Sequence, residues 1–206
     1  LRGGAPAVKR LGLIIAAELV FVLPLAVLAL SAAAAYWTFP DILPRRFDAR
    51  ALEYLAVNRA GILSSLASSA AYSIAVVMVT GVMCLLPARL LSRSRVPGRR
   101  LLEGVLLAPA LLPVMVFAFG AQQLFLFLRI ADTPLAVILV LAVHAFPYML
   151  RALTAGYTSF SPEGYLAARN LGGSRRAAFR AAELPQLVPA LAAGGSVVFL
   201  VAFSDY

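Results

Sequence analysis

A few polar side chains stand inside long apolar stretches of this sequence, and their types could do chemistry in a membrane. They are two carboxylates, an imidazole and two adjacent amides: Glu18, Asp205, His144, Gln122 and Gln123. Carboxylates and imidazoles at such positions can bind solutes or pass protons, and amides can line a polar path. We therefore treat Glu18, Gln122, Gln123 and Asp205 as candidate pathway residues.

Each of these residues also has a plainer interpretation. Glu18 can be protonated against a neighbouring helix, or can lie near enough to the membrane edge to reach the headgroups. Gln122 and Gln123 can make ordinary hydrogen bonds between helices or at the interface. His144 has no second ionisable residue close by in the sequence and stands near the predicted cytoplasmic end of its apolar run, which favours a structural hydrogen bond over a proton relay.

Motifs for catalysis or metal binding are missing from the sequence. With a single histidine and a single cysteine, Cys84, the chain can form neither an HExxH motif nor a CxxC motif, nor an internal disulfide. It also has no Walker A loop for binding nucleotide phosphates. We expect no catalytic residue, no metal site, no cofactor and no hydrolysis of ATP by this chain.

Membrane-spanning helices are the elements that must position the polar residues. The 206 residues are 62% hydrophobic and 13% charged, whereas a soluble domain is about half apolar and about a quarter charged. A spanning helix needs about 17 to 25 mostly apolar residues. The composition therefore predicts an all-α, polytopic membrane protein, one transmembrane domain over residues 1–206, with spans at 11–35, 62–86, 101–128, 134–150 and 187–203.

Two of these spans carry a further signal. The first is long for the hydrophobic part of a signal peptide, so we interpret it as a retained span. The third contains Pro109 and Pro113, which predict a kink. Outside the spans, a first external loop at 36–61 begins with aromatic residues typical of a membrane interface, Tyr36, Trp37 and Phe39.

The net charge of +9 would fit nucleic-acid binding, but its distribution argues for membrane topology instead. Lys and Arg concentrate in short cytoplasmic connections of membrane proteins. If the N-terminus is cytoplasmic, thirteen of the 18 basic residues lie inside and five outside. Those inside include Arg2, Arg89, Arg93, Arg95, Arg99 and Arg100. We predict a multi-pass protein of the bacterial inner (plasma) membrane with a cytoplasmic N-terminus and no nucleic-acid partner.

The cytoplasmic loop at 151–186 contains helix signals of its own. Ser161 can cap a helix, and Glu163 places negative charge at its positive end. Gly172 can end that helix in the left-handed conformation, and Ser174 can cap a second, basic helix. We predict two short helices joined by a glycine turn over residues 161–185, a unit that we call the elbow.

The elbow resembles the cytoplasmic EAA loop of the permease subunits of binding-protein-dependent ABC importers. The pattern of that family reads Glu-Ala-Ala, three residues, Gly, nine residues, Ile, any residue, then Leu-Pro. Several positions of this chain match it at the family spacing: Ala167, Ala168, Gly172, Leu184 and Pro185.

Two positions depart from the pattern. Leu166 stands in place of the glutamate and Ala182 in place of the isoleucine. The family's glutamate supports contact with the ATPase, and Glu163, one turn earlier, is the candidate substitute. The resemblance implies that exposed Tyr165, Leu166 and Arg169 enter a groove on the ATPase. The implied ATPase-coupling residues are Glu163, Tyr165, Leu166, Ala167, Ala168, Arg169, Gly172, Leu184 and Pro185.

The resemblance extends over most of the chain. Trp37, the Phe146-Pro147-Tyr148 sequence and the closing Ser204-Asp205-Tyr206 are similar to the branch that handles polyamines, thiamine or ferric iron. It implies the type I importer fold and a sixth span, so we expect the sequence, which starts at Leu1 and stops beside an apolar run, to be a fragment. The implied partners are a dimer of cytoplasmic ABC ATPases, a second permease subunit, an extracytoplasmic solute-binding protein and the lipid bilayer.

Other functions remain open at this point. A proton-coupled secondary transporter or channel subunit could use Glu18 and His144, and its uptake would collapse with the proton gradient. A structural subunit of an export complex would not depend on a binding protein. The sequence does not determine the solute, nor whether the permease pairs with a copy of itself or with a different chain.

Overall fold

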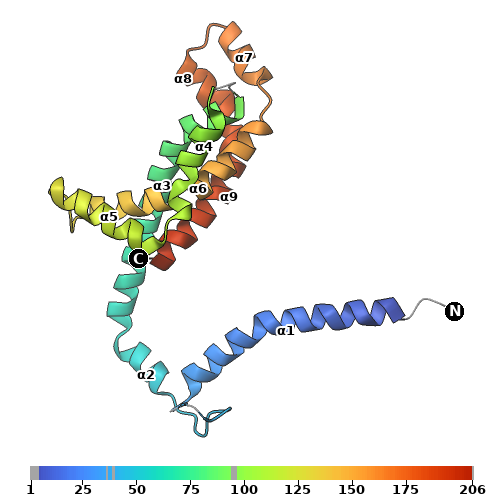
Figure 1. Ribbon diagram of the computed structural model, residues 1–206, viewed down its shortest axis with the longest axis vertical. Coiled ribbons are helices and arrows are strands. Elements are labelled where there is room, and N and C mark those ends of the chain that lie inside the picture. Colours follow the sequence, from blue (N-terminus) through green and yellow to red (C-terminus); the bar gives the residue numbers. More distant parts are fainter. Residues whose placement is uncertain (1–4, 36, 39, 94–96, 206) are drawn as a thin grey trace. The chain divides into compact units, whose positions relative to one another are not determined.

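The computed structural model describes residues 5–35, 37–38, 40–93 and 97–205 (Figure 1). Six residues used in the sequence predictions lie outside this set: Leu1, Arg2, Tyr36, Phe39, Arg95 and Tyr206.

The described backbone is mainly helical and contains no strand, apart from one isolated bridge between Ala34 and Phe47. This confirms the predicted all-α fold class. The elements are α1 (Ala5–Ala33), α2 (Arg50–Val57), α3 (Arg59–Arg93), α4 (Arg99–Leu107), the 3-10 helix η1 (Ala108–Leu111), α5 (Val114–Phe127), α6 (Pro134–Thr158), α7 (Glu163–Asn170), α8 (Arg175–Ala178), the π-helix η2 (Phe179–Glu183) and α9 (Leu184–Asp205).

Helices of membrane-spanning length and composition recur along the described chain. Four qualify, Leu11–Ala33, Arg59–Ser92, Pro134–Thr158 and the continuous helix Arg175–Asp205, and a fifth is obtained if a bent pair counts as one span. The last three of these helices contain the predicted spans 62–86, 134–150 and 187–203, whereas the first ends at Ala33, two residues before the predicted end of its span. These helices support a protein that crosses the membrane several times.

The bent pair corresponds to the predicted third span and differs from the expected kinked helix. Its two parts, Arg99–Leu111 and Met115–Phe127, meet at 101°. Leu112 is extended, with φ −85° and ψ 137°, because the ring of the following Pro113 disfavours helical backbone there. The helix therefore stops completely and restarts after Pro113 as α5.

The chain divides into two compact units, residues 1–64 and 65–206, which we describe separately. In the first unit the apolar stretch of α1 is not buried. The loop after it is closed by Arg50, which pairs with Asp48 and donates to the carbonyl of Ala35 at 2.7 Å. The backbone N–H of Arg50 also donates to Asp48, which lowers the pKa of that carboxyl. The short helix α2 then follows within the predicted external loop 36–61.

In the second unit, α6 and α9 pack closely in opposite directions through small residues (Figure 1). A Cβ added at Gly156 would lie 2.5 Å from the Cβ of Ala190, and one added at Gly194 would lie 2.8 Å from the Cβ of Ala152. Each helix thus presents two small residues four positions apart. This spacing puts both on one face and lets the backbones approach, as is common between membrane helices.

Helix α3 completes the core of this unit. Thr80 donates a hydrogen bond to the carbonyl of Ala142 at 3.4 Å, and the Cys84 thiol lies 3.6 Å from the carbonyl of Phe146. Both donors are buried, so α3 is tied to the backbone of α6 by polar contacts as well as by apolar packing. The core of α3, α6 and α9 positions the elbow at its end.

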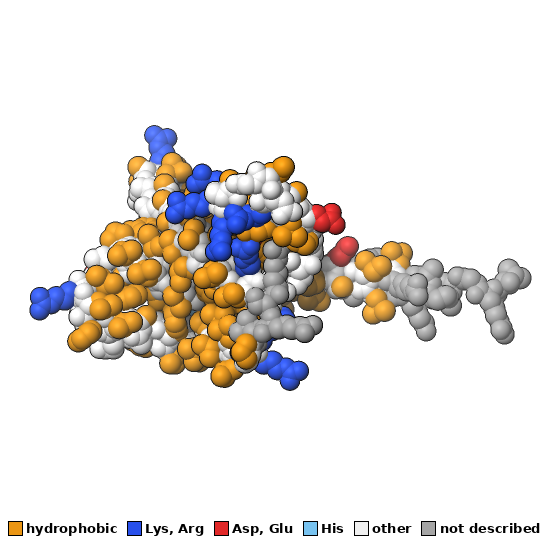
Figure 2. Space-filling view, turned by 90° about the horizontal axis from the view of Figure 1, so that it is seen from above, with side chains coloured by type: hydrophobic (Ala, Val, Ile, Leu, Met, Phe, Trp, Pro, Cys, Tyr) orange, Lys and Arg blue, Asp and Glu red, His pale blue; other side chains and the backbone are white. Residues whose placement is uncertain are grey.

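Figure 2 looks onto the end of this unit that carries α7 and α8, where basic side chains gather among hydrophobic ones.

Candidate functional site

The first helix of the elbow, α7, begins at Glu163, as the position of that residue in the first turn predicts. Ser161, however, does not cap it, and that prediction is wrong. Pro162 already has helical backbone, with φ −74° and ψ −9°, and occupies the cap position itself. Ser161 lies one residue too early, and its N–H donates to the side-chain oxygen of Gln186 at 3.3 Å.

The glycine turn that ends α7 is present as predicted. Gly172 has φ +82°, its N–H donates to the carbonyl of Arg169 at 3.1 Å, and the N–H of Gly173 donates to the carbonyl of Ala168 at 3.0 Å. This pair of bonds is the Schellman pattern, which satisfies the last carbonyls of a helix. Arg169 adds a guanidinium bond of 2.7 Å to the carbonyl of Gly173. The turn is therefore held at a defined angle.

The second helix of the elbow continues without interruption into α9. Ser174 caps α8 by accepting the N–H of Ala177 at 3.1 Å, which confirms that prediction. The helix then widens into the π turn η2 and continues as α9, so Leu184 and Pro185 lie in the first turn of α9 instead of closing the elbow. Leu184 is half-buried and Pro185 is exposed.

Helix α7 folds back onto η2 through its smallest residue. A Cβ at Gly164 would lie 3.5 Å from the Cβ of Ala182, the residue that replaces the isoleucine of the family pattern. Ala168 lies four positions after Gly164 and three after Tyr165, spacings that place residues on one side of a helix, and both Tyr165 and Ala168 are half-buried. The opposite side of α7 is exposed.

Tyr165 therefore differs from its predicted, outward-facing role. The guanidinium of Arg89, near the end of α3, lies 5.3 Å from the centroid of the Tyr165 ring. The same guanidinium lies 3.2 Å from a carboxylate oxygen of Glu183 on η2. The side chain of Glu183 is completely buried, whereas 37% of the surface of the Arg89 side chain is exposed to solvent. One cation thus contacts α7 and η2 together.

Sequence reasoning missed this pair. In the sequence, Arg89 is one of several basic residues that indicate a cytoplasmic connection. Glu183 occupies the position of the family pattern, just before Leu-Pro, where any residue is allowed. A signal for Glu183 did exist, since it is the one acidic residue between Glu163 and Asp205, directly before an apolar run. A lone carboxylate at such a place needs a cationic partner.

The exposed side of α7, which we call the coupling face, consists of four residues predicted to couple to the ATPase and of Leu171, which was not predicted. Leu166 keeps 53% of its exposure, and Leu171, at the end of the helix, keeps 88%. An apolar surface of this kind on a polar loop is typical of a contact with another protein. The coupling face comprises Glu163, Leu166, Ala167, Arg169 and Leu171, all exposed.

The loop between α6 and α9, predicted at 151–186, is shorter than expected, because α6 continues to Thr158. Nothing in residues 151–158 interrupts a helix, and Arg151 is exposed on it. As a result His144 lies near the middle of α6 and not near the end of its helix, where the sequence interpretation had placed it.

His144 also has an ionisable neighbour that the sequence did not indicate. Its Nε2 atom lies 4.0 Å from a carboxylate oxygen of Asp205 on α9, and its ring centroid lies 5.9 Å from that of Phe117 on α5. Its Nδ1 atom is buried and makes no hydrogen bond to any described residue. Asp205 keeps 34% of its side-chain exposure. The structure thus brings one predicted pathway residue beside the histidine of the alternative proton path.

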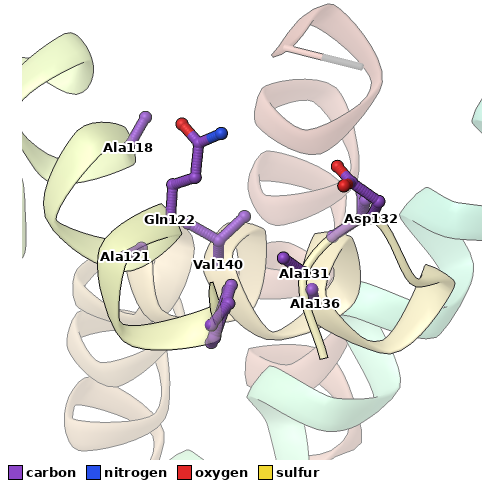
Figure 3. Close-up of a pocket in the computed structure, with 9 residues that line it drawn as sticks. Ala118, Ala121, Gln122, Ala131, Asp132, Ala136 and Val140 are labelled. Atoms are coloured by element: carbon purple, nitrogen blue, oxygen red, sulfur yellow. The ribbon is translucent and has the colours of Figure 1, made fainter. Parts of the chain in front are cut away.

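The remaining pathway candidates lie elsewhere. Gln122 lines a small pocket of about 170 Å³ between α5 and the start of α6. Figure 3 shows Gln122 and Asp132 at opposite sides of this pocket. Gln123 is exposed and does not line it, and Glu18 is exposed on α1 in the first unit.

Comparison with known proteins decides the family. Residues 82–206 match the model of the binding-protein-dependent transport system inner membrane component. The chain belongs to this family of transport permeases. Among the described residues, the matched region holds the end of α3 and everything from α4 to α9, so it includes Arg89, Glu183 and the whole elbow. Glu18 lies outside it.

Two relatives show the same kinship. The chain is 30% identical over 138 residues to the sulfate transport system permease protein CysT of Salmonella typhimurium and, equally, to that of Escherichia coli. Each alignment covers 61% of this chain and 50% of the relative, so the chain spans about half the length of the relatives it matches. The family and the apolar helices together make this permease a multi-pass protein of the inner membrane.

Proposed function

We propose that this chain is a membrane-spanning permease subunit of an ATP-driven importer, coupled to a separate ATPase through the elbow. The observation that supports this most directly is the build of the elbow. It is a short helix closed by a rigid glycine turn, with an exposed coupling face, at the end of a helix pair that is itself locked by small residues. A rigid unit of this kind can be displaced by a bound ATPase and can transmit that displacement to the membrane-spanning helices.

The predicted coupling residues of the elbow form two groups, those that would contact the ATPase and those that hold the shape of the elbow. Glu163, Leu166, Ala167 and Arg169 lie on the exposed coupling face and would touch the ATPase. Because Leu166 replaces the family's glutamate, the contact at that position depends on burial of apolar surface. The charged interactions with the ATPase would then come from Glu163 and Arg169 on the same face. The other residues shape the elbow itself: Tyr165, Ala168 and Leu184 are half-buried, Gly172 forms the turn, and Pro185 lies in the first turn of α9.

The solute that we propose is sulfate or a similar small oxyanion. The relatives that the chain matches are named as sulfate transport system permeases. The polyamine, thiamine and ferric-iron solutes considered from the sequence rest on resemblance of short segments alone. Asp205, Gln122, Gln123 and Glu18 stay candidate pathway residues in this proposal.

The proposed assembly follows from the orientation. With the N-terminus and elbow in the cytoplasm, two ATPases bind the elbows of two paired permease subunits. An extracytoplasmic binding protein delivers solute to the outer loops, and a sixth span completes each subunit. The single transmembrane domain then comprises all of residues 1–206.

The test uses the full-length permease with its ATPase and binding protein in vesicles. We expect uptake of radiolabelled sulfate that requires ATP and the binding protein and survives collapse of the proton gradient. Leu166→Asp on the coupling face should weaken binding of the ATPase to the permease, whereas Leu52→Asp on the exposed surface of α2 should leave that binding unchanged. Uptake driven by the proton gradient without ATP would favour the secondary transporter that uses Glu18 and His144.

A further inference from the structure

A single guanidinium connects three elements at the base of the elbow. Arg89 belongs to α3, its Cζ atom lies 5.3 Å from the ring centroid of Tyr165 on α7, and its Nη2 atom lies 3.2 Å from Oε2 of Glu183 on η2. Arginine suits this place because its flat, always charged group can stack on an aromatic ring while its edge meets a carboxylate.

Within this cluster, the ion pair between Arg89 and Glu183 is the contact that is most costly to break. Glu183 has no exposed surface, and its two carboxylate oxygens make no hydrogen bond to any described residue. Arg89 is therefore the cation that compensates its charge in the described part of the chain. A buried charge that loses its counter-ion is strongly unfavourable, so Glu183 and Arg89 are expected to move together.

The backbone at Glu183 is itself unusual. Residues Phe179–Glu183 form a π turn inside an otherwise continuous helix from Arg175 to Asp205. Turns of this kind are rare and are frequently found at functional sites. Here the π turn lies between the exposed basic helix α8 and the membrane helix α9, at the level where α7 packs through Gly164.

We propose that Arg89 is a positioning residue that passes movement of the elbow to α3. This proposal rests on the proposed function. When an ATPase displaces α7, Tyr165 and Glu183 shift with the elbow, and the guanidinium carries that displacement into α3. Helix α3 is tied in turn to the backbone of α6 through Thr80 and Cys84. The ion pair thus couples the elbow to the spans by a route other than the α6 and α9 helices that lead into it.

The test compares variants of the full permease assembled with its ATPase and binding protein. Replacement of one partner alone leaves a buried charge and threatens folding. The informative variant is therefore the double change Arg89→Gln with Glu183→Gln, which leaves two neutral amides able to bond to each other. Arg89→Lys keeps the charge but loses the flat stacking group. Arg151→Gln, an exposed arginine on α6, is the matched control.

The measurements are ATPase binding, basal ATP hydrolysis, and radiolabelled sulfate transported per ATP hydrolysed. We expect the double variant to bind the ATPase and hydrolyse ATP at the basal wild-type rate, while transport per ATP falls at least about fivefold, the lower end of typical coupling between sites. Arg89→Lys should lie between the double variant and the wild type, and Arg151→Gln should match the wild type.

Two results would overturn this inference while leaving the proposed function intact. One is an unchanged transport per ATP in the double variant. The other is a double variant that fails to insert or to bind the ATPase, since the pair would then serve only the stability of the fold. A wild-type permease that does not bind an ATPase at all would instead remove the proposed function, and this inference with it.

Discussion

The imidazole of His144 on α6 and the carboxylate of Asp205 on α9 face each other at 4.0 Å, next to the ring of Phe117. Two residues that the sequence separates by the whole elbow therefore form one polar site between packed helices. If this contact contributes to the fold, changes at the two positions cannot act independently.

We predict that His144→Ala and Asp205→Ala are non-additive. Residues in contact typically show a coupling of about 0.5 to 3 kcal/mol in double-mutant cycles. Because Asp205 is partly exposed, we expect a value near the lower end, about 0.5 to 1 kcal/mol. The measurement is unfolding of the detergent-solubilised protein for both single variants and the double variant. Gln122→Ala, exposed on α5, combined with His144→Ala is the control pair, and a coupling no larger than that of the control would refute the contact.

The glycine turn of the elbow provides a second prediction. Gly172 has φ +82° with no atom within 4 Å of an added Cβ, so Gly172→Ala introduces backbone strain without a clash. An L residue in this conformation costs about 1 to 2 kcal/mol. We expect the elbow angle to relax and transport per ATP to fall.

Gly98 offers a matched control for this change. It has φ +75° and equally open surroundings, but it lies at the start of α4. Gly98→Ala therefore carries the same local strain outside the elbow, and we expect normal coupling. Equal transport by the two alanine variants would show that the turn has no special role.

The close approach of α6 and α9 predicts a size limit at Gly156. An alanine there would place its Cβ 2.5 Å from that of Ala190, and overpacking of this kind costs about 1 to 3 kcal/mol. We expect Gly156→Ala to lower the unfolding midpoint and the added change Ala190→Gly to restore part of it. Gly120→Ala, where no atom lies within 4 Å, should be neutral or stabilising by up to about 1 kcal/mol. A failure of Ala190→Gly to rescue would contradict the observed crossing.

The orientation can be tested by cysteine labelling, because the native Cys84 is buried and should not react. Cysteines introduced at Arg175 and Arg176, both exposed at the elbow, should react only with a reagent that reaches the cytoplasm. A cysteine at Arg45, in the loop after α1, should react with a reagent that cannot cross the membrane. Labelling of Arg175→Cys from outside would rule out contact between the elbow and a cytoplasmic ATPase.

Much of the fold could be predicted because it depends on local properties of the chain. Runs of apolar residues long enough to cross a bilayer predicted the α-helical class, and the apolar helices found in the structure agree. Gly172 and Ser174 predicted the turn and the second cap, since left-handed backbone and side-chain capping are decided within a few residues. The same local reasoning failed at the start of α7, where Pro162 has helical backbone and is itself the N-cap residue, so Ser161 lies one position too early to cap the helix.

Sequence alone thus determined the helical class, most of the long apolar helices and the glycine turn of this permease, because backbone preference and hydrophobic length are properties of short segments. Tertiary structure decided that Tyr165 turns inward under Arg89, that Glu183 is buried beside the same cation, and that His144 meets Asp205. These pairs join residues far apart in the chain, and only the packing of α3, α6 and α9 brings their charges within reach of one another.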